Sequence, residues 1–280
     1  MITSDNASEK SEVRKNICHT NRDRGLFRSM ADEIHEHQGE RLSTSSRHLD
    51  DLLSGGLETG VITQVYGGPA SGKTHFCHTL CVNLAALYQI CYIDTEGGFR
   101  ENKIKLMAGA RRLDWNSLRQ NIHIAEPRDS QEQEVCIEEA SGLLARSDSK
   151  IKLLILDSLM YHYRTEYPNR SDLSERAHRL NIVMHKLRSI AQTKNIAVLL
   201  TNQSVSTPRK EEDEDPKPCC GGNIVSYLST YILHLRRRKS RSSYPGITAT
   251  IVKSPLVGSK FHLLHIIDSG FLDVDYRLSD

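Results

Sequence analysis

From residue 42 onward, two kinds of segment alternate along the chain. Short continuous apolar runs, typical of buried parallel strands, are separated by stretches whose apolar residues recur every three or four positions, as in helices. Strands that alternate with helices predict an α/β fold with a mostly parallel central sheet flanked by helices. The runs predicted as strands are VITQVY (61–66), ICYID (90–94), KLLILDS (152–158) and NIAVLLTNQ (195–203).

The stretches between these runs predict helices. A short helix within residues 43–56 is capped by serine and stopped by two glycines, and a polar helix covers about 130–146. Two other helices each have one apolar face. Those faces consist of Cys77, Leu80, Cys81, Leu84 and Leu87 in the first, and of Leu180, Val183, Met184, Leu187 and Ile190 in the second.

Both ends of the chain depart from this alternation. Residues 1–41 are polar and mixed in charge, which predicts an N-terminal extension, with a short linker helix at 27–38. Residues 42–280 form the predicted core domain. Near its end, strand-like runs follow one another without long helices, and this pattern predicts a C-terminal antiparallel meander. Those runs cover 230–235, 247–252 and 261–267.

Composition changes this picture little. The 280 residues are 26% charged and 38% hydrophobic with a net charge of +2, an ordinary balance for a globular chain. No apolar run approaches the ~18 residues that span a bilayer, and the N-terminus has no signal-peptide pattern, so we expect no membrane partner. Seven cysteines without a C-x-x-C pair argue against a disulfide framework or zinc ribbon and favour a reducing, intracellular compartment.

The segment GGPASGKT fits G-x-x-x-x-G-K-[ST] and stands between a predicted strand and a predicted helix. In such a loop the backbone N–H groups face phosphates, Lys73 places a charge beside the β and γ oxygens, and Thr74 offers a hydroxyl to Mg²⁺. The alternative is a glycine-rich turn without a ligand, and the flanking strand and helix argue against it. The residues expected to bind nucleotide are Gly67, Gly68, Pro69, Ala70, Ser71, Gly72, Lys73 and Thr74.

Polar side chains also follow three other strand runs, at the sheet edge where ligands bind. Asp157 ends LLILD and is expected to hold Mg²⁺ together with Thr74. Glu96 and Gln203 follow two further runs, and there a carboxylate can orient water while an amide can sense the γ-phosphate. Singly, each of these is also typical of a solvated loop residue. The predicted catalytic residues are Glu96, Lys73 and Gln203, and the predicted cofactors are ATP, since no N-K-x-D motif is present, and Mg²⁺.

Together these segments resemble the RecA/RadA recombinase superfamily. The matching pieces are LDDLLSGGLETGVITQVYGGPASGKT, YIDTEGGFR, LLILDSLMYHYRTEYPNRSDLSERAHRL, VLLTNQ and GGNIVSYLSTYILHLRR, in order between residues 42 and 270. DTEGGF and HIAEPRDSQEQ are also similar to the archaeal RadB-type branch, which consists of a bare ATPase core. The resemblance implies a RecA-type P-loop ATPase core.

The resemblance also implies roles for particular residues. Lys73 and Thr74 match the phosphate lysine and the Mg²⁺ hydroxyl, and Asp157 matches the Walker B aspartate. Glu96 matches the glutamate that polarises the attacking water. Gln203 matches the glutamine that links the γ-phosphate state to the DNA-binding loop that follows it.

Similarity to the RadB-type branch further implies an accessory role in homologous recombination and DNA repair, with weak ATP hydrolysis. The implied partners are DNA and a RadA-type recombinase or another recombination protein. Assembly into a homo-oligomer stays open, because Phe27 and Ala31 are four residues apart where the family uses a spacing of three. The implied location is the cytoplasm, with the nucleoid, in an archaeon and the nucleus in a eukaryote.

Two loops of this superfamily face DNA. The first matches YRTEYPNR, where Arg164, Tyr167 and Arg170 combine guanidinium groups with an aromatic ring, a mixture suited to phosphate contact and base stacking. A solvated charged turn is the alternative. The second loop follows Gln203 and contains five adjacent acids, EEDED (211–215), which would repel a phosphate backbone.

The strongest basic cluster is RRRKSR (236–241), at an expected hairpin turn. It predicts contacts with the DNA backbone, although a solubilising turn has the same composition. Two other functions stay open: a filament-forming RadA-like strand-exchange recombinase, which the acidic run opposes, and a KaiC-like ATP-dependent signalling protein without DNA binding, which the basic cluster opposes. The cluster's expected DNA contacts are Arg236, Arg237, Arg238, Lys239 and Arg241.

Overall fold

The computed structural model describes residues 39–205, 216, 218–238 and 243–275. The chain divides between Gln38 and Gly39, and the unit from Gly39 onward is the one described below. The sequence-based boundary between an extension (1–41) and a core (42–280) stays a prediction.

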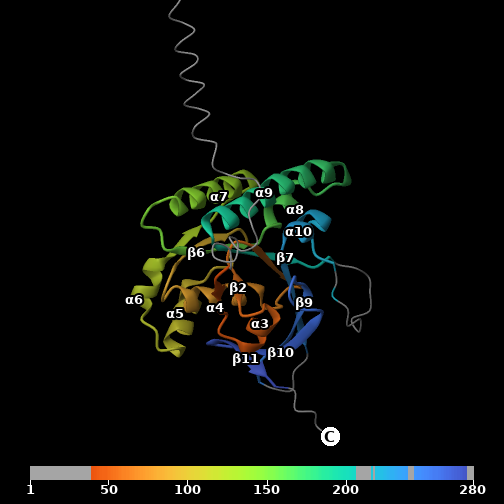
Figure 1. Cartoon of the computed structure of the whole chain (residues 1–280). Coiled ribbons are helices and arrows are strands. Elements are labelled where there is room, and N and C mark those ends of the chain that lie inside the picture. The colour runs from red at the N-terminus through yellow and green to blue at the C-terminus, as the bar shows by residue number, and fades with distance from the viewer. Residues whose placement is uncertain (1–38, 206–215, 217, 239–242, 276–280) are drawn as a thin grey trace, which may run out of the picture. The chain divides into compact units, whose positions relative to one another are not determined.

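A nine-stranded sheet forms the centre of this unit, in the order β11-β10-β9-β8-β3-β7-β6-β4-β5 (Figure 1). The strands from β8 to β5 are all parallel, whereas β9, β10 and β11 are antiparallel. The predicted mostly parallel α/β fold with a C-terminal antiparallel meander is therefore confirmed. The strand bounds are β3 Ile62–Gly67, β4 Gln89–Asp94, β5 Ile122–Ala125, β6 Ile151–Asp157, β7 Ala197–Gln203, β8 Tyr231–Arg238, β9 Gly246–Lys253, β10 Lys260–Ile267 and β11 Gly270–Val274, with β1 Arg41–Leu42 and β2 Leu57–Glu58 in a separate ribbon.

Helices cover both faces of the sheet, and each face has its own apolar core (Figure 1). On one face lie α3 (Arg47–Leu52), α4 (Lys73–Leu84), α5 (Glu101–Ala110) and α6 (Trp115–Leu118). On the other lie α7 (Ser130–Leu144), α8 (Tyr161–Glu166), α9 (Leu173–Lys194) and α10 (Gly222–Leu228). Burial on both faces explains why the parallel strands are continuously apolar in the sequence.

The predicted one-sided helix after the glycine-rich loop is wrong in two respects. It ends at Leu84, and Leu87 beyond it is 72% exposed. Within the helix, residues 75–82 are all buried, including His75 and His78. The reason is that β11 packs against α4, with the ring of Phe271 against those of His75 and Phe76, so the helix has no wide solvent face. Strand β11 itself was not predicted.

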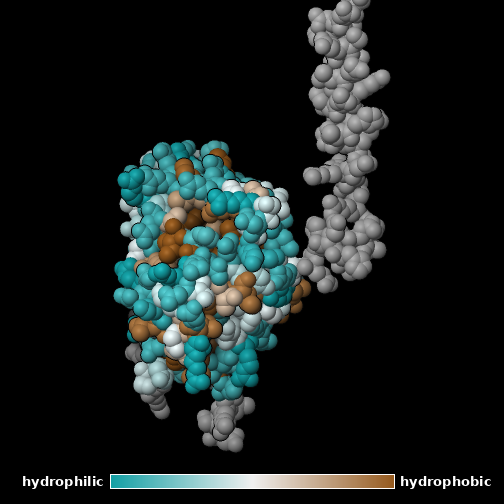
Figure 2. Space-filling model, turned by 90° about the vertical axis from the view of Figure 1, so that its left-hand side faces the viewer, coloured by the Kyte–Doolittle hydropathy of each residue, from teal (hydrophilic) through white to brown (hydrophobic). Residues whose placement is uncertain are grey.

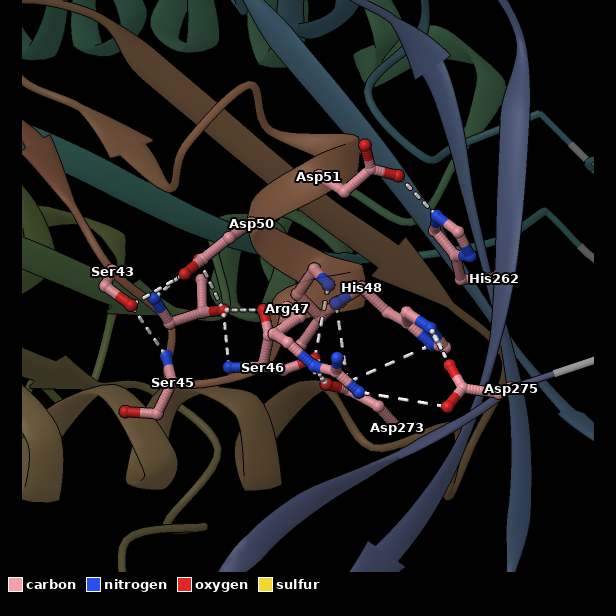
Figure 3. A network of polar contacts seen from close by, with 12 residues as sticks. Ser43, Ser45, Ser46, Arg47, His48, Asp50, Asp51, His262, Asp273 and Asp275 are labelled. Atoms are coloured by element: carbon pink, nitrogen blue, oxygen red, sulfur yellow. Dashed lines mark hydrogen bonds and ion pairs between the residues drawn. The ribbon is translucent and has the colours of Figure 1, made fainter.

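Polar contacts fasten the start of α3 to the end of the meander (Figure 3). The Asp273 carboxylate accepts hydrogen bonds from the Ser46 hydroxyl at 2.5 Å and from the Arg47 N–H at 2.9 Å, and so caps the helix from β11. The His48 and His262 rings stack with their centroids 4.3 Å apart. The C-terminal strands are thereby tied to the segment that precedes the glycine-rich loop.

Strand β5 forms the edge of the sheet opposite to β11. Beside it, Phe99, Trp115, Ile122 and Ile124 line a pocket. Figure 2 views the molecule from this side and shows apolar atoms set among hydrophilic ones. Among the described residues, every helix is too short or too polar to cross a membrane.

Gly67 joins β3 to the glycine-rich loop, and no larger residue fits there. A Cβ atom at this position would lie 2.1 Å from the Leu235 carbonyl oxygen, a contact that only a backbone shift can relieve. We therefore expect Gly67→Ala to lower the free energy of unfolding by about 1–3 kcal/mol, as measured by urea denaturation. Gly109→Ala is the control, because a Cβ there meets nothing within 4 Å. Equal stability of the two variants would contradict the packing at Gly67.

Candidate nucleotide-binding site

The predicted site residues lie together along one edge of the sheet, the edge formed by the carboxyl-terminal ends of the parallel strands. In the register between β3 and β7, Gly67 stands beside Gln203, and in the register between β4 and β6, Asp94 stands beside Asp157. Glu96 lies two residues beyond the end of β4. The structure therefore brings together the glycine-rich loop, Asp157, Glu96 and Gln203, while their chemical roles stay predictions.

The glycine-rich loop leads directly into α4, which begins at Lys73. Gly72 adopts a φ of 98°, a left-handed conformation that favours glycine, and so turns the chain into the helix. The Lys73 ammonium group donates to the carbonyl oxygens of Gly67 at 3.1 Å and Gly68 at 2.9 Å. Burial lowers the pKa of Lys73, while the charges of Glu96 and Asp157 oppose that shift.

Asp157 is buried and fixed by two hydroxyl groups that were not predicted. Tyr92 donates to one carboxylate oxygen at 2.8 Å, and Thr201 donates to the other. Burial raises the pKa of Asp157, and the hydrogen bonds from Thr201, Tyr92 and Thr74 lower it in part. Such partners orient a metal-binding carboxylate, as outer-shell groups do in known metal sites.

Asp94 shapes the turn that carries Glu96. Its carboxylate accepts from the backbone N–H groups of Glu96 at 3.3 Å, Gly98 at 3.0 Å and Phe99 at 2.8 Å. Three backbone bonds to one buried side chain hold the turn in a single conformation. The sequence signal for this structural role of Asp94 was its position at the end of ICYID, immediately before Thr-Glu-Gly-Gly.

The Glu96 carboxylate is the meeting point of several polar side chains. Its Oε1 atom accepts from the Ser158 hydroxyl at 2.5 Å and from the Gln203 amide at 3.4 Å. The Gln203 side-chain oxygen in turn accepts from the guanidinium group of Arg164. A continuous chain of contacts thus joins the predicted catalytic glutamate to a predicted DNA-binding arginine.

The residues present fit a magnesium nucleotide. The Ser71 hydroxyl is buried without a hydrogen-bond partner in the described part of the chain, as expected of a group that serves a ligand. The N-terminus of α4 and Lys73 offer positive charge for phosphates. The Thr74 hydroxyl and the Asp157 carboxylate are hard oxygen donors of the kind Mg²⁺ prefers.

The first predicted DNA loop is partly helical. Arg164 lies in the last turn of α8, and Arg170 begins a short 3₁₀ turn (Arg170–Asp172); both side chains are exposed. Tyr167 is half-buried, with the Arg179 guanidinium 5.8 Å from its ring centroid. One face of this ring therefore already has a cationic partner.

The base of the second loop is a short antiparallel stem. The Val205 N–H donates to Pro218 and the Cys220 N–H to Gln203, both at 2.8 Å. The Asn202 amide donates to the Cys220 carbonyl at 2.7 Å. Gln203 therefore lies both beside the glycine-rich loop and in the stem of this second loop. The acidic run 211–215 lies outside the described residues.

The basic cluster lies at the hairpin of β8 and β9, as predicted, but β8 extends three residues further than the predicted strand run. Arg236, Arg237 and Arg238 end this strand, where they pair with Thr248, Ile247 and Gly246 of β9. Side chains alternate along a strand, so Arg237 points to the face opposite to the other two. Lys239 and Arg241 lie outside the described residues, as do Phe27 and Ala31.

A glycine-rich loop with the pattern G-x-x-x-x-G-K-[ST], at the edge of a sheet that turns antiparallel beyond β8, is characteristic of RecA-like P-loop ATPases, a class that uses ATP with Mg²⁺. The family model for Rad51 matches residues 37–274, and the chain therefore belongs to the Rad51 family. A similar relative is the DNA repair and recombination protein RadA of Cenarchaeum symbiosum (strain A), 34% identical over 244 residues. The match covers 85% of this chain and 60% of the relative, so the chain spans about 60% of the relative's length. The RecA/RadA resemblance is confirmed, and the narrower likeness to the RadB-type branch stays a prediction.

Proposed function

We propose that this protein binds ATP with Mg²⁺ and also binds DNA, and that it assists a RadA-type recombinase or another recombination protein in DNA repair. ATP hydrolysis is slow in this proposal and acts as a conformational switch. The observation that carries it is the contact chain from Glu96 through Gln203 to Arg164. This series of side-chain contacts offers a direct physical route by which a nucleotide and DNA can influence each other.

The contacts of Glu96 support slow turnover. The Oε1 atom of the Glu96 carboxylate already accepts from Ser158 and Gln203. A water molecule that donates to this oxygen has to compete with both donors. Hydrolysis then depends on rearrangement of Gln203, which is the residue at the stem of the second loop.

Two sequence features support an accessory role over strand exchange. The run EEDED places five acids in the loop expected to face DNA, and the Phe27–Ala31 spacing differs from that of the family's assembly element. Regular long filaments on single-stranded DNA with ATP, seen by electron microscopy, would instead support the filament-forming recombinase. Because DNA is its proposed partner, the protein would act at the nucleoid of an archaeal cell or in the nucleus of a eukaryotic cell.

DNA binding is tested by a salt titration on single-stranded, duplex and branched DNA. We expect measurable affinity that falls with salt, with a logarithmic slope of about −0.7 for each phosphate contact on single strands. Arg238→Glu is expected to weaken binding and to make the slope less steep, since Arg238 is exposed at the end of β8. The control is Arg146→Glu, a charge reversal at an exposed site after α7. If the wild type binds none of the three DNA forms, the proposed function is wrong and the KaiC-like signalling function is favoured instead.

A further inference from the structure

We propose that Arg164 is a positioning residue for the ATPase site: its guanidinium holds Gln203 against Glu96, and a DNA phosphate that takes this guanidinium releases Gln203. This inference rests on the proposed function and adds a mechanism by which DNA reaches the nucleotide site. In the absence of DNA, Arg164 then holds Gln203 in place, a role separate from its predicted contact with DNA phosphate.

The asymmetry of the glutamine amide gives Arg164 this influence. The amide has one accepting oxygen and one donating nitrogen, on opposite sides of the same planar group. Arg164 occupies the oxygen, and the nitrogen of the same amide points to Glu96 at 3.4 Å. With the oxygen fixed, the direction of the donor is fixed as well. Without Arg164, Gln203 is free to rotate away from Glu96.

Helix α8 presents Arg164 from a rigid base. On one side, the His162 ring contacts the Pro127 carbonyl at 3.0 Å, and the Tyr163 hydroxyl donates to Glu134 at 2.9 Å. On the other, the Glu166 carboxylate accepts from the backbone N–H of Ser130 at 2.7 Å. The helix is thus pinned before and after Arg164. A competitor for the guanidinium therefore moves the Arg164 side chain and leaves the helix in place.

A phosphate is a strong competitor for this guanidinium. Arg164 is exposed and, within the described ranges, forms no ion pair with a carboxylate; its side-chain partner there is a neutral amide. The guanidinium is already charged in its bond to the Gln203 oxygen, but a phosphate adds an opposite charge and accepts from two N–H groups at once in bidentate geometry. DNA at α8 would therefore displace Gln203 from Arg164.

The consequence is a resting restraint that DNA removes. With Arg164 on Gln203, the Oε1 atom of Glu96 holds two hydrogen bonds, from Gln203 and from Ser158. With Arg164 on a phosphate, Gln203 can leave Glu96, and the Oε1 atom can then accept a hydrogen bond from water in its place. DNA-stimulated hydrolysis follows from the loss of this one contact.

The test compares Arg164→Gln with the wild type in ATPase assays without DNA. The loss of a restraining hydrogen bond is expected to raise kcat by about 3- to 10-fold. Arg188→Gln removes one charge from an exposed site on α9 and controls for net charge. Thermal unfolding of both variants checks that the fold is retained. A DNA-free kcat that stays equal to the wild-type value, or falls, would overturn the inference.

Saturating DNA provides the second arm. We expect it to raise kcat of the wild type and to leave that of Arg164→Gln nearly unchanged, since the variant lacks the contact that DNA releases. Equal fold-stimulation of the two proteins would also overturn the inference. The failure of this inference can be told apart from the failure of the proposed function. If the wild type does not bind DNA, the proposed function is wrong. The DNA-free kcat of Arg164→Gln, by contrast, tests the Arg164–Gln203 contact alone.

Discussion

Replacing Lys73 with alanine is expected to weaken ATP binding by roughly 10²- to 10³-fold and to abolish hydrolysis. Lys73 is the charged side chain of the glycine-rich loop, and it lies against the Gly67 and Gly68 carbonyls at the start of α4. Removal of one partner from a buried charge pair costs about 3–5 kcal/mol, and each 1.4 kcal/mol corresponds to a factor of ten in affinity. Isothermal titration calorimetry with ATP and Mg²⁺ measures the effect.

The matched control for this change is Lys194→Ala, at an exposed position in the last turn of α9. It removes the same charge and is expected to bind ATP as the wild type does. Nucleotide affinity of Lys73→Ala within threefold of the wild-type value would show that the loop does not bind phosphates as described.

Glu96→Gln is expected to separate binding from hydrolysis. The amide keeps the size of the side chain and can still contact Ser158, but it cannot take a proton from water. General-base catalysis contributes about 10²- to 10⁴-fold, so turnover is expected to fall by at least about 100-fold while ATP affinity stays within a few-fold of the wild type. Single-turnover assays with labelled ATP measure both quantities.

Glu139→Gln, an exposed carboxylate on α7, is the control for loss of charge, with turnover expected to match the wild type. Hydrolysis by Glu96→Gln at the wild-type rate would remove Glu96 from its proposed role. Loss of ATP binding in the same variant would instead show that its carboxylate positions the nucleotide.

The common location of the glycine-rich loop, Asp157, Glu96 and Gln203 could be predicted because its signals are local in the sequence. A glycine-rich loop between a strand and a helix is contiguous, and parallel strands place their carboxyl ends at one edge. Asp157, Glu96 and Gln203 each follow an apolar run, so their common location followed from strand order alone. The same reasoning predicted the mostly parallel sheet and its antiparallel end.

What the sequence did not reveal depends on contacts between distant segments. The Tyr92 and Thr201 hydroxyls reach Asp157 because β4, β6 and β7 are neighbours in a particular register, which no local pattern encodes. The Arg164–Gln203 contact likewise depends on where α8 packs against the sheet. The predicted strand run ended at residue 235, whereas pairing with β9 extends β8 to Arg238, three residues into the basic cluster.

In the proposed function, ATP and DNA influence each other through Gln203. Binding free energies are reciprocal, so a factor by which DNA changes ATP affinity must equal the factor by which ATP changes DNA affinity. The direct measurement is the affinity of the wild type for a non-hydrolysable ATP analogue, with and without saturating single-stranded DNA. We expect DNA to change the affinity for the analogue by about 5-fold or more. Identical affinities in the two titrations, with DNA bound in one of them, would contradict it.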